Sequence, residues 1–384
     1  DDNLTDVGSI RIVREKNSVL MESVFNGKAF MFCFLNGKNI ELETYSSEGK
    51  KLGEKVYEDV SKWERMRAMM ATSAGANGEV NQSIFPIGEE GFLKQSVTKG
   101  EKWGYQLTAY NNDLSVRWET EAPSSPMIES LDVIEVTEDH IIGSMFQQKN
   151  RMDQPDFTML AMFDVHTGKK LWAKQLTQQG KNMSVLNVFP SETQDGMFVI
   201  GEIFGPSDKI FKDKSKGIFA MRMDMAGVPE QTELFSWEED ILPYVPADAK
   251  GRKELDRIFF HKVVRLKNGT VHCIGEEYKK VLGATGGTQI TTKDMVVLEL
   301  DSDLKLKGCE VVGKSKSRFE FPSQFMYLSP SVLAQLIKQM GLFDYAFTSQ
   351  DRLADRYFAS YVDFDRSKNE SGDRVGTYIG TITG

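Results

Sequence analysis

The sequence predicts an all-β protein, a β-propeller of about six blades with four strands in each blade. Short runs with strand composition follow one another with almost no helix between them, which excludes a parallel α/β sheet. Asn-Gly, Glu-Gly and Thr-Gly pairs separate many of these runs, and such pairs favour hairpin turns. Similar turns recur at intervals of about 50 to 77 residues, which is typical of four-stranded blades rather than of a solenoid.

The hairpin predicted for residues 157–176 is the clearest of these units. Residues 157–163 are apolar enough for a buried strand, and residues 170–176 alternate polar and apolar side chains. Asp164, Thr167 and Gly168 lie between them and suit a turn, because Asp bonds nearby backbone amides and Gly accepts positive φ. A weaker copy ends at Trp118, where the clear copy has Trp172.

We expect the whole chain to be one propeller domain whose last blade is completed by the N-terminus. The last group of runs contains three clear strands, and an open ring would leave an exposed strand edge. Residues 9–15 therefore supply the missing strand in our prediction, and a seventh blade beyond residue 384 is the alternative. The predicted domain covers residues 1–384, with blades at 8–60, 81–122, 128–178, 184–237, 257–314 and 342–384.

One short helical insertion is predicted near residues 329–341. Ser329 can cap the helix, Pro330 suits its first turn, and Gly341 suits its end. Apolar residues between these positions fall on one stripe at helical spacing. We expect the stripe to pack on its own domain, and docking of a partner is the alternative.

Composition and charge limit the classes of partner. The chain has 384 residues, of which 40% are hydrophobic and 27% charged, as in ordinary soluble globular proteins. Its net charge of −9 argues against nucleic acid and against anionic membrane surfaces, because both attract positive charge. No apolar run approaches the roughly 20 residues of a membrane span, so we expect no transmembrane segment.

The three cysteines are expected to be small buried strand residues. Cys33, Cys273 and Cys309 each lie in an apolar or alternating run. An odd number of cysteines without CxxC spacing predicts neither a zinc site nor a disulfide framework, and a single bridge stays open.

The hairpin at residues 157–176 resembles the repeat of pyrroloquinoline-quinone-type propellers. The pattern Ala-x-x-Asp-x-x-Thr-Gly-x-x-x-Trp is formed here by Ala161, Asp164, Thr167, Gly168 and Trp172. The resemblance implies that the Trp packs between neighbouring blades and has a structural role. It implies a fold rather than an activity.

Comparison with three groups of propeller proteins bears on function. The quinone enzymes are longer, with eight blades, adjacent cysteines and a calcium-binding carboxylate cluster, so we expect no cofactor in this chain. The lipoprotein scaffold of outer-membrane assembly shares the repeat and is not an enzyme. The whole chain, including residues 360–366, resembles an uncharacterised family of secreted or periplasmic propellers from Bacteroidetes. This resemblance implies an extracytoplasmic location (periplasmic, secreted or surface-associated).

The sequence predicts no catalytic residue and no metal site. The four histidines form no HExxH motif and no closely spaced pair, and there is no GxSxG elbow or P-loop. The oxygen-rich residues 363–373 miss the EF-hand spacing and include Arg366 and Lys368. We therefore interpret this run as a solvated loop, with calcium binding as the alternative.

Long connections between second and third strands give the best prediction of a binding face. They span residues 147–156, 205–216, 278–293 and 365–373. In four-stranded blades these connections emerge on one face, and binding residues are often found on loops held by a rigid scaffold. The candidate binding residues are Trp103, Lys149, Arg151, Lys209, Phe211, Lys212, Lys279 and Lys280.

These observations favour a non-enzymatic extracytoplasmic binding or scaffold protein that presents its loop-rich face to a protein, peptide or glycan. The alternative is a carbohydrate-active hydrolase or lyase with its site at the channel mouth. A third hypothesis, a quinone oxidoreductase, would require cofactor-dependent absorbance. A deep pocket with perturbed carboxylates would favour an enzyme, and a shallow face with exposed aromatic residues would favour a binding protein.

Overall fold

Antiparallel sheets form most of the protein, whose structure is a computed structural model. It describes residues 13–14, 18–58, 60, 82–99, 103–150, 157–191, 195–210, 212–245, 254–282, 288–321, 330–351, 353–364 and 377–384. Within these ranges, five sheets follow one another along the chain. The predicted all-β class is therefore confirmed.

The first two sheets contain three groups of four consecutive strands. The first group is β1 (Ser18–Phe25), β2 (Ala29–Asn36), β3 (Asn39–Ser46) and β4 (Lys51–Tyr57). The second group is β5 (Ile84–Ile87), β6 (Gly91–Lys99), β7 (Trp103–Asn111) and β8 (Val116–Glu121). The third group is β9 (Ile128–Val136), β10 (His140–Gln148), β11 (Met159–Asp164) and β12 (Lys170–Gln175). A parallel bridge between Gly104 and Glu129 joins the second and third groups into one sheet.

The remaining three sheets form the fourth, fifth and sixth groups. The fourth group is β13 (Thr177–Gln178), β14 (Lys181–Pro190), β15 (Gly196–Phe204), β16 (Gly217–Asp224) and β17 (Pro229–Ser236), followed by the helical turns η1 (Trp237–Ile241) and η2 (Leu242–Tyr244). The fifth group is β18 (Arg257–Arg265), β19 (Val271–Leu282), β20 (Thr288–Leu300), β21 (Leu306–Val312) and β22 (Arg318–Phe321). The sixth group is β23 (Tyr345–Asp351), β24 (Arg356–Phe364) and β25 (Thr377–Thr383).

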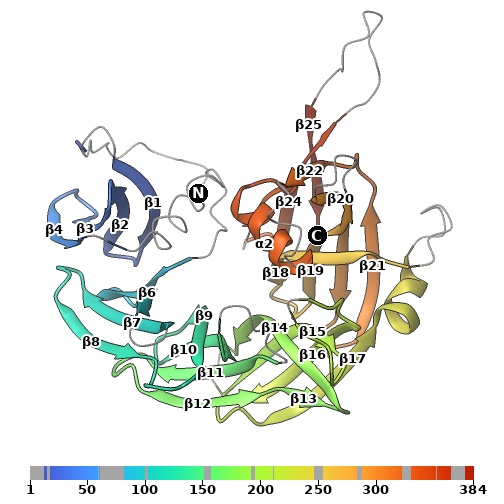
Figure 1. The fold of residues 1–384 in the computed structure, drawn as a ribbon, viewed down its shortest axis with the longest axis horizontal. Coiled ribbons are helices and arrows are strands. Elements are labelled where there is room, and N and C mark those ends of the chain that lie inside the picture. The colour runs from blue at the N-terminus through green and yellow to red at the C-terminus, as the bar shows by residue number, and fades with distance from the viewer. Residues whose placement is uncertain are drawn as a thin grey trace, which may run out of the picture.

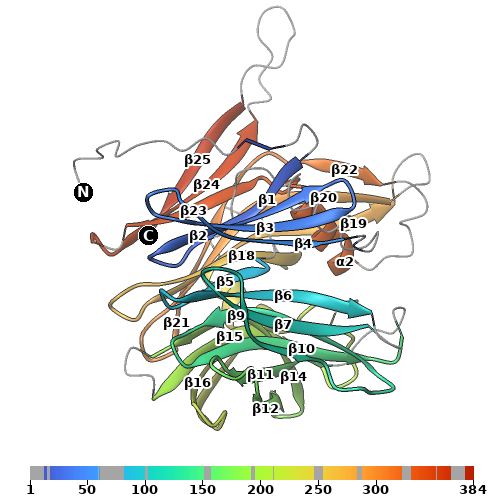
Figure 2. The ribbon, with the colours of Figure 1, turned by 90° about the vertical axis from the view of Figure 1, so that its left-hand side faces the viewer.

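Successive groups pack face to face around an arc (Figure 1). A view from the side shows the first group stacked above the second and third (Figure 2). Each interface between neighbouring groups contains its own buried apolar cluster; for example, Met31 of the first group packs with Phe92 of the second. Similar clusters join each later pair of groups. Because burying one such side chain contributes roughly 1.5–3 kcal/mol, these interfaces hold the arc together.

The outer hairpins share one turn geometry and one contact with the next group. The turn residue with positive φ is Gly168 in the third group and Gly227 in the fourth, with φ of 70° and 73°. The indole N–H of Trp118 donates to the carbonyl of Val165 at 2.9 Å, and Trp172 donates to Met225 at 3.0 Å. Each Trp thus links its group by a hydrogen bond to the turn of the following group.

In two other groups the strand position of Trp118 and Trp172 holds a different residue, which makes a different contact with the next group. In the first group it is Gly53, whose Cβ, if present, would lie 2.3 Å from the backbone oxygen of Asp113. In the fourth group it is Gln231, whose side chain donates to the Asp303 carbonyl at 3.1 Å. The packing distance between groups therefore determines which side chain fits.

A β-bulge interrupts the first strand of five groups at corresponding places. One extra residue stands opposite the second strand, which re-aims the side chains that follow. The extra residues are Met21, Ile134, Leu186, His261 and Ala346. These bulges define corresponding positions in the groups, and we use this correspondence below.

The predicted helical insertion is present as α2 (Pro330–Gln339). Leu333, Ala334 and Ile337 are fully buried against Tyr278, Ile290 and Phe321 of the fifth group, as part of one apolar cluster. The helix therefore packs on its own domain, as expected, while Met340 just after it is 43% exposed.

Other expectations had different outcomes. Residues 278–293 are not simply a loop, because β19 extends to Leu282 and β20 begins at Thr288. The described residues form an arc rather than a demonstrated closed ring of six blades, so closure stays a prediction. The closing strand predicted for residues 9–15 lies almost wholly outside the described residues. Cys33, Cys273 and Cys309 are buried strand residues, as predicted, and none of them forms a disulfide.

Candidate functional site

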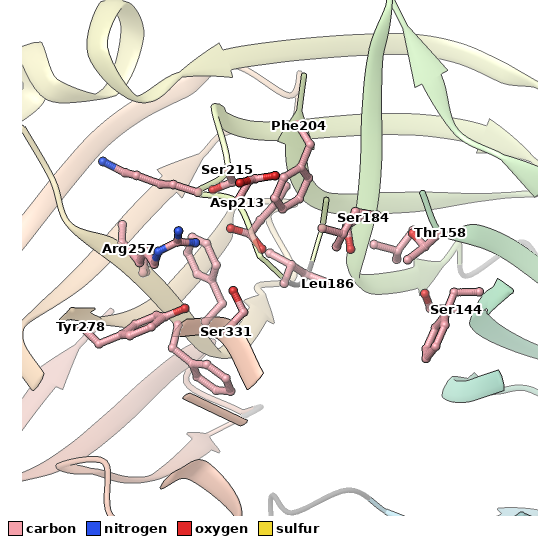
Figure 3. Close-up of a pocket in the computed structure, with 18 of the residues that line it drawn as sticks. Ser144, Thr158, Ser184, Leu186, Phe204, Asp213, Ser215, Arg257, Tyr278 and Ser331 are labelled. Atoms are coloured by element: carbon pink, nitrogen blue, oxygen red, sulfur yellow. The ribbon is translucent and has the colours of Figure 1, made fainter. Parts of the chain in front are cut away.

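A cavity of about 230 Å³ lies where the third, fourth and fifth groups meet (Figure 3). Its walls come mainly from the first two strands of these groups, together with the connection 205–216 and the start of α2. Six hydroxyl side chains line it: Ser144, Thr158, Ser184, Ser215, Tyr278 and Ser331. Aromatic walls are provided by Phe146, Phe204, Trp237, Phe259 and Phe260. This combination of hydroxyl groups and ring faces suits a small polar ligand.

A repeated sequence pattern on the second strands places many of these side chains. In the fourth group, Gly201 lies opposite the bulged strand, and its Cβ, if present, would lie 2.0 Å from the Ser184 carbonyl oxygen. Glu202 and Phe204 follow on one face, because alternate strand residues share a face. On the second strands of the third, fourth and fifth groups, the pattern Gly–polar–x–aromatic is formed by Gly143–Ser144–x–Phe146, Gly201–Glu202–x–Phe204 and Gly275–Glu276–x–Tyr278.

Glu202 is a carboxyl group of this pocket whose pKa is raised. Burial raises its pKa to about 7, although a hydrogen bond with Ser215 and the charge of Arg257 act in the opposite direction. The indole N–H of Trp237 donates to Ser215 Oγ at 3.0 Å, which fixes the hydroxyl group beside Glu202. No cation of the described residues lies within ion-pair distance of this carboxyl. Glu202 therefore exchanges its proton near neutral pH.

Arg257 and Tyr278 lie on the side of the pocket away from Ser144 and Thr158 (Figure 3). Arg257 Nη2 donates to the Lys212 carbonyl at 3.0 Å, which orients the guanidinium group. Burial raises the pKa of Tyr278 to about 12, and hydrogen bonds with Ser331 and Arg257 oppose that rise. The phenol is therefore neutral at physiological pH and can donate or accept a hydrogen bond.

The other charged groups of the pocket have partners within the protein. Asp213 Oδ2 accepts a hydrogen bond from the backbone N–H of Lys209 at 2.7 Å. Lys214 Nζ donates to the carbonyl of Leu255, and Asp256 forms an ion pair with Lys293. These contacts fix the rim of the pocket.

Glu276, the counterpart of Glu202 in the fifth group, has a closed environment. The ammonium group of Lys314 lies 3.0 Å from Glu276 Oε1 and 2.5 Å from Asp344 Oδ2, and the Lys314 and Glu276 side chains are both fully buried. The backbone N–H of Tyr345 donates to Glu276 Oε2 at 3.1 Å. Burial raises the pKa of both carboxyls, while Lys314 opposes the rise.

His261 is buried beside this cluster and is neutral. Its ring stacks on Tyr345 with centroids 4.4 Å apart, and its Nε2 atom lies 3.5 Å from Glu276 Oε2. Burial lowers the pKa of His261 well below the ordinary value, and the charges of Lys338 and Lys314 add to this effect. His261 therefore contributes a polar ring rather than a second cation to the cluster.

The lining of the pocket includes none of the predicted binding residues whose side chains the structure describes. Trp103 begins β7, and its side chain, like the whole of Arg151 and Phe211, lies outside the described residues. The five others are described, and the pocket lining includes none of their side chains: Lys149, Lys209, Lys212, Lys279 and Lys280. Lys279 and Lys280 lie on β19 rather than in a loop. Binding by these residues stays a prediction.

The predicted long connections nevertheless contribute to the pocket. Residues Ile210, Asp213, Lys214 and Ser215 come from the connection 205–216, and Tyr278 begins the segment 278–293. Lys209 and Lys212 act through their backbone groups, on Asp213 and Arg257 respectively. Sequence reasoning missed Glu202 and the hydroxyl residues because it favoured basic and aromatic loop residues. The repeated Gly–polar–x–aromatic pattern could have identified part of this lining.

His, Cys, Asp and Glu side chains do not gather in groups of three or more that could hold a metal ion within the ranges that the structure describes. No helix of the described part of the chain has the length and apolar character needed to cross a bilayer.

Solved structures with weak similarity to the chain belong to varied proteins. Prolyl oligopeptidase B from Galerina marginata, bound to a 35mer hydrolysis and macrocyclization substrate, is 8% identical with a TM-score of 0.37, covering 93% of this chain and 47% of that chain. The C-terminal domain of Pseudomonas aeruginosa PilY1 is 9% identical with a TM-score of 0.31, covering 88% and 79%. The mannose phosphorylase MPT-4 from Leishmania mexicana is 9% identical with a TM-score of 0.28, covering 70% and 74%.

The chain spans about half the length of the prolyl peptidases that it matches. No curated protein sequence matches it. One family model matches residues 1–379, almost the entire chain. The chain therefore belongs to DUF6770, a family of unknown function.

Proposed function

We propose that the protein is an extracytoplasmic binding protein that holds the end of a short glycan in the pocket between its third, fourth and fifth groups. The observation that supports this most is the lining, in which six hydroxyl side chains and five aromatic rings surround a cavity of about 230 Å³. Hydroxyl groups can both donate to and accept from sugar hydroxyls, and ring faces pack against the apolar faces of a sugar.

The rigidity of the walls favours binding without rearrangement. Most lining residues lie on paired strands, and the rim is fixed by contacts within the protein, such as that of Arg257 with the Lys212 carbonyl. A preorganised pocket reduces the cost of ordering side chains when a ligand binds. The connections at this end of the groups would present the rest of a glycan, or a protein that bears it, to the pocket.

A glycan array followed by titration calorimetry tests this proposal. We expect wild-type protein to bind a subset of short glycans, and Ser144→Leu, which fills the pocket, to weaken binding at least tenfold. Phe347→Ala is the matched control, because Phe347 is 44% exposed on β23 and does not line the pocket. A wild-type protein that binds no glycan, or equal binding by Ser144→Leu, would overturn the proposal. Fractionation of cells that express the native gene tests the location.

A second candidate function, a carbohydrate-active hydrolase, is favoured by one observation. With its pKa raised to about 7, Glu202 keeps a proton that it could donate to a leaving group near neutral pH. Turnover of chromogenic glycosides that is lost in Glu202→Gln would support the enzyme. Glycan binding without turnover would support the binding protein.

A further inference from the structure

Glu202 and Glu276 occupy the same position in successive groups. Glu202 pairs with Ile218 and follows Gly201, and Glu276 pairs with Met295 and follows Gly275. A hydroxyl residue stands three positions before the residue of the third strand that pairs with each carboxyl. It is Ser215 for Glu202 and Thr292 for Glu276, and the Thr292 hydroxyl donates to Asp344 Oδ2 at 3.1 Å.

The two groups differ in what they supply opposite the carboxyl. The strand register makes Lys314 the counterpart of Trp237, because Phe235 pairs with Ile218 as Val312 pairs with Met295. Lys314 gives Glu276 a buried ammonium group at 3.0 Å. Trp237 gives its indole N–H to Ser215 instead. The protein thus provides a cation for one carboxyl and leaves its counterpart facing an open pocket.

The charge of the pocket is compatible with a cation at this point. Its charged lining contains four acidic and two basic residues: Asp132, Glu202, Asp213, Asp256, Lys214 and Arg257. The two basic groups are oriented by backbone carbonyls of the protein. An aromatic wall that includes Trp237 also favours a cation, because an ammonium group is attracted to an indole face.

We infer that the ligand carries a primary ammonium group among its hydroxyls, as an amino sugar does, and that Glu202 binds this ammonium as Glu276 binds Lys314. The inference rests on the proposed function of the pocket and specifies its ligand class. An amino sugar is preferred to a lysine side chain because the lining offers six hydroxyl groups in addition to the carboxyl.

The inference predicts a coupling between binding and proton release. An ammonium ion favours the ionised form of Glu202, so binding should release about half a proton at pH 7 and weaken as the pH falls. Glu202 shares this pocket with the following titratable or charged groups: Asp132, Asp213, Lys214, Asp256, Arg257 and Tyr278. Burial keeps Tyr278 neutral in this pH range, and Asp256 has Lys293 as its ion-pair partner.

Calorimetry with a matched pair of probes tests the inference. Glucamine (1-amino-1-deoxy-D-glucitol) differs from D-glucitol by one ammonium group in place of one hydroxyl. At pH 8 we expect the wild type to bind glucamine at least tenfold more tightly than glucitol, and we expect proton release at pH 7 when two buffers are compared. Glu202→Gln should remove both the preference and the proton release, and Glu138→Gln, an exposed turn residue, should keep both.

The outcomes separate this inference from the proposed function. Glucitol binding without a preference for glucamine would overturn the inference and leave the glycan proposal standing. Failure of the wild type to bind either probe or any glycan would overturn both. Tighter binding of Nα-acetyl-lysine amide than of glucamine would overturn the assignment to an amino sugar. Circular dichroism of each variant confirms that the fold is retained.

Discussion

The surroundings of Glu202 and Glu276 show how one strand position can serve two purposes. Both glutamates follow a glycine opposite a bulge, and a hydroxyl residue (Ser215 or Thr292) stands three positions before the residue of the third strand that pairs with each of them. Around Glu276 the protein adds Lys314 and Asp344 and excludes water. Around Glu202 it adds Trp237 and leaves a cavity. The fold therefore fixes where a carboxyl lies, while neighbouring residues decide whether it is sealed or available.

Removal of the ammonium group from the sealed site should have the largest effect. Lys314→Met would leave two buried carboxyls without a cation, and breaking such a buried pair costs about 3–5 kcal/mol of unfolding free energy. Denaturant unfolding would measure this loss. Lys307→Met is the control: Lys307 is 55% exposed in its ion pair with Asp301, and water screens such a pair, so this variant should lose much less stability. Equal losses in the two variants would contradict a sealed site.

Replacement of Glu202, the carboxyl that faces the pocket, should instead increase the stability of the protein. Glu202 has a pKa of about 7 in the folded state against an ordinary value of 4.5, so the folded state holds more protons than the unfolded state between these pH values. Its contribution to stability is therefore present below pH 4.5 and is lost as the pH rises to about 7. Glu202→Gln removes this loss and should stabilise the protein by at most about 3 kcal/mol at pH 7.5.

Unfolding of wild type and Glu202→Gln at pH 4.5 and pH 7.5 measures this difference. The gain of the variant should be larger at pH 7.5. A gain in unfolding free energy that does not change with pH would mean that the pKa of Glu202 is not raised by burial.

The glycine before each glutamate provides a test of the shared position. Gly201→Ala places a Cβ 2.0 Å from the Ser184 carbonyl oxygen, so the strands must shift. We expect a loss of about 2 kcal/mol in stability, within the range for overpacking, together with weaker ligand binding. Gly308→Ala is a matched strand control, because its Cβ would have no atom within 4 Å. Similar behaviour of the two variants would refute the role of this close approach.

The hydroxyl partner of Glu202 should have the smallest effect. Ser215→Ala removes a hydrogen bond that lowers the pKa of Glu202, so this pKa should rise above about 7. Loss of a hydrogen bond of this kind costs about 1 kcal/mol. NMR titration of the Glu202 carboxyl carbon measures the shift. An unchanged pKa would mean that the hydroxyl does not contact the carboxyl in solution.

Much of the fold could be predicted from the sequence because its signals are local. Turn residues such as Asp164 and Gly168 determine a hairpin by their own backbone chemistry, and Pro330 and Gly341 mark a helix in the same way. The predicted connection over residues 278–293 is wrong at residues 278–282 and 288–293, which belong to β19 and β20. Its β-branched residues after Thr288 instead extend β20 against β19.

The pocket could be predicted only in part because it depends on contacts between groups. Glu202 and Arg257 lie on different groups, 55 positions apart, and only the packing of β15 beside β18 brings them to one cavity. The long connection 205–216 contributes Ile210, Asp213, Lys214 and Ser215 to the lining of the pocket. The role of Trp237 or Lys314 opposite a glutamate follows from strand register, which a single sequence does not specify.

The three buried thiols make the interfaces between groups observable. Cys33 lies between the first and second groups, whereas Cys273 and Cys309 lie between the fourth and fifth. Burial raises the pKa of Cys33 to about 12 and also raises that of Cys273, so neither is reactive while its interface is closed. The rate at which each thiol of the unmodified protein is alkylated would therefore report when each of these two interfaces opens, and which opens first.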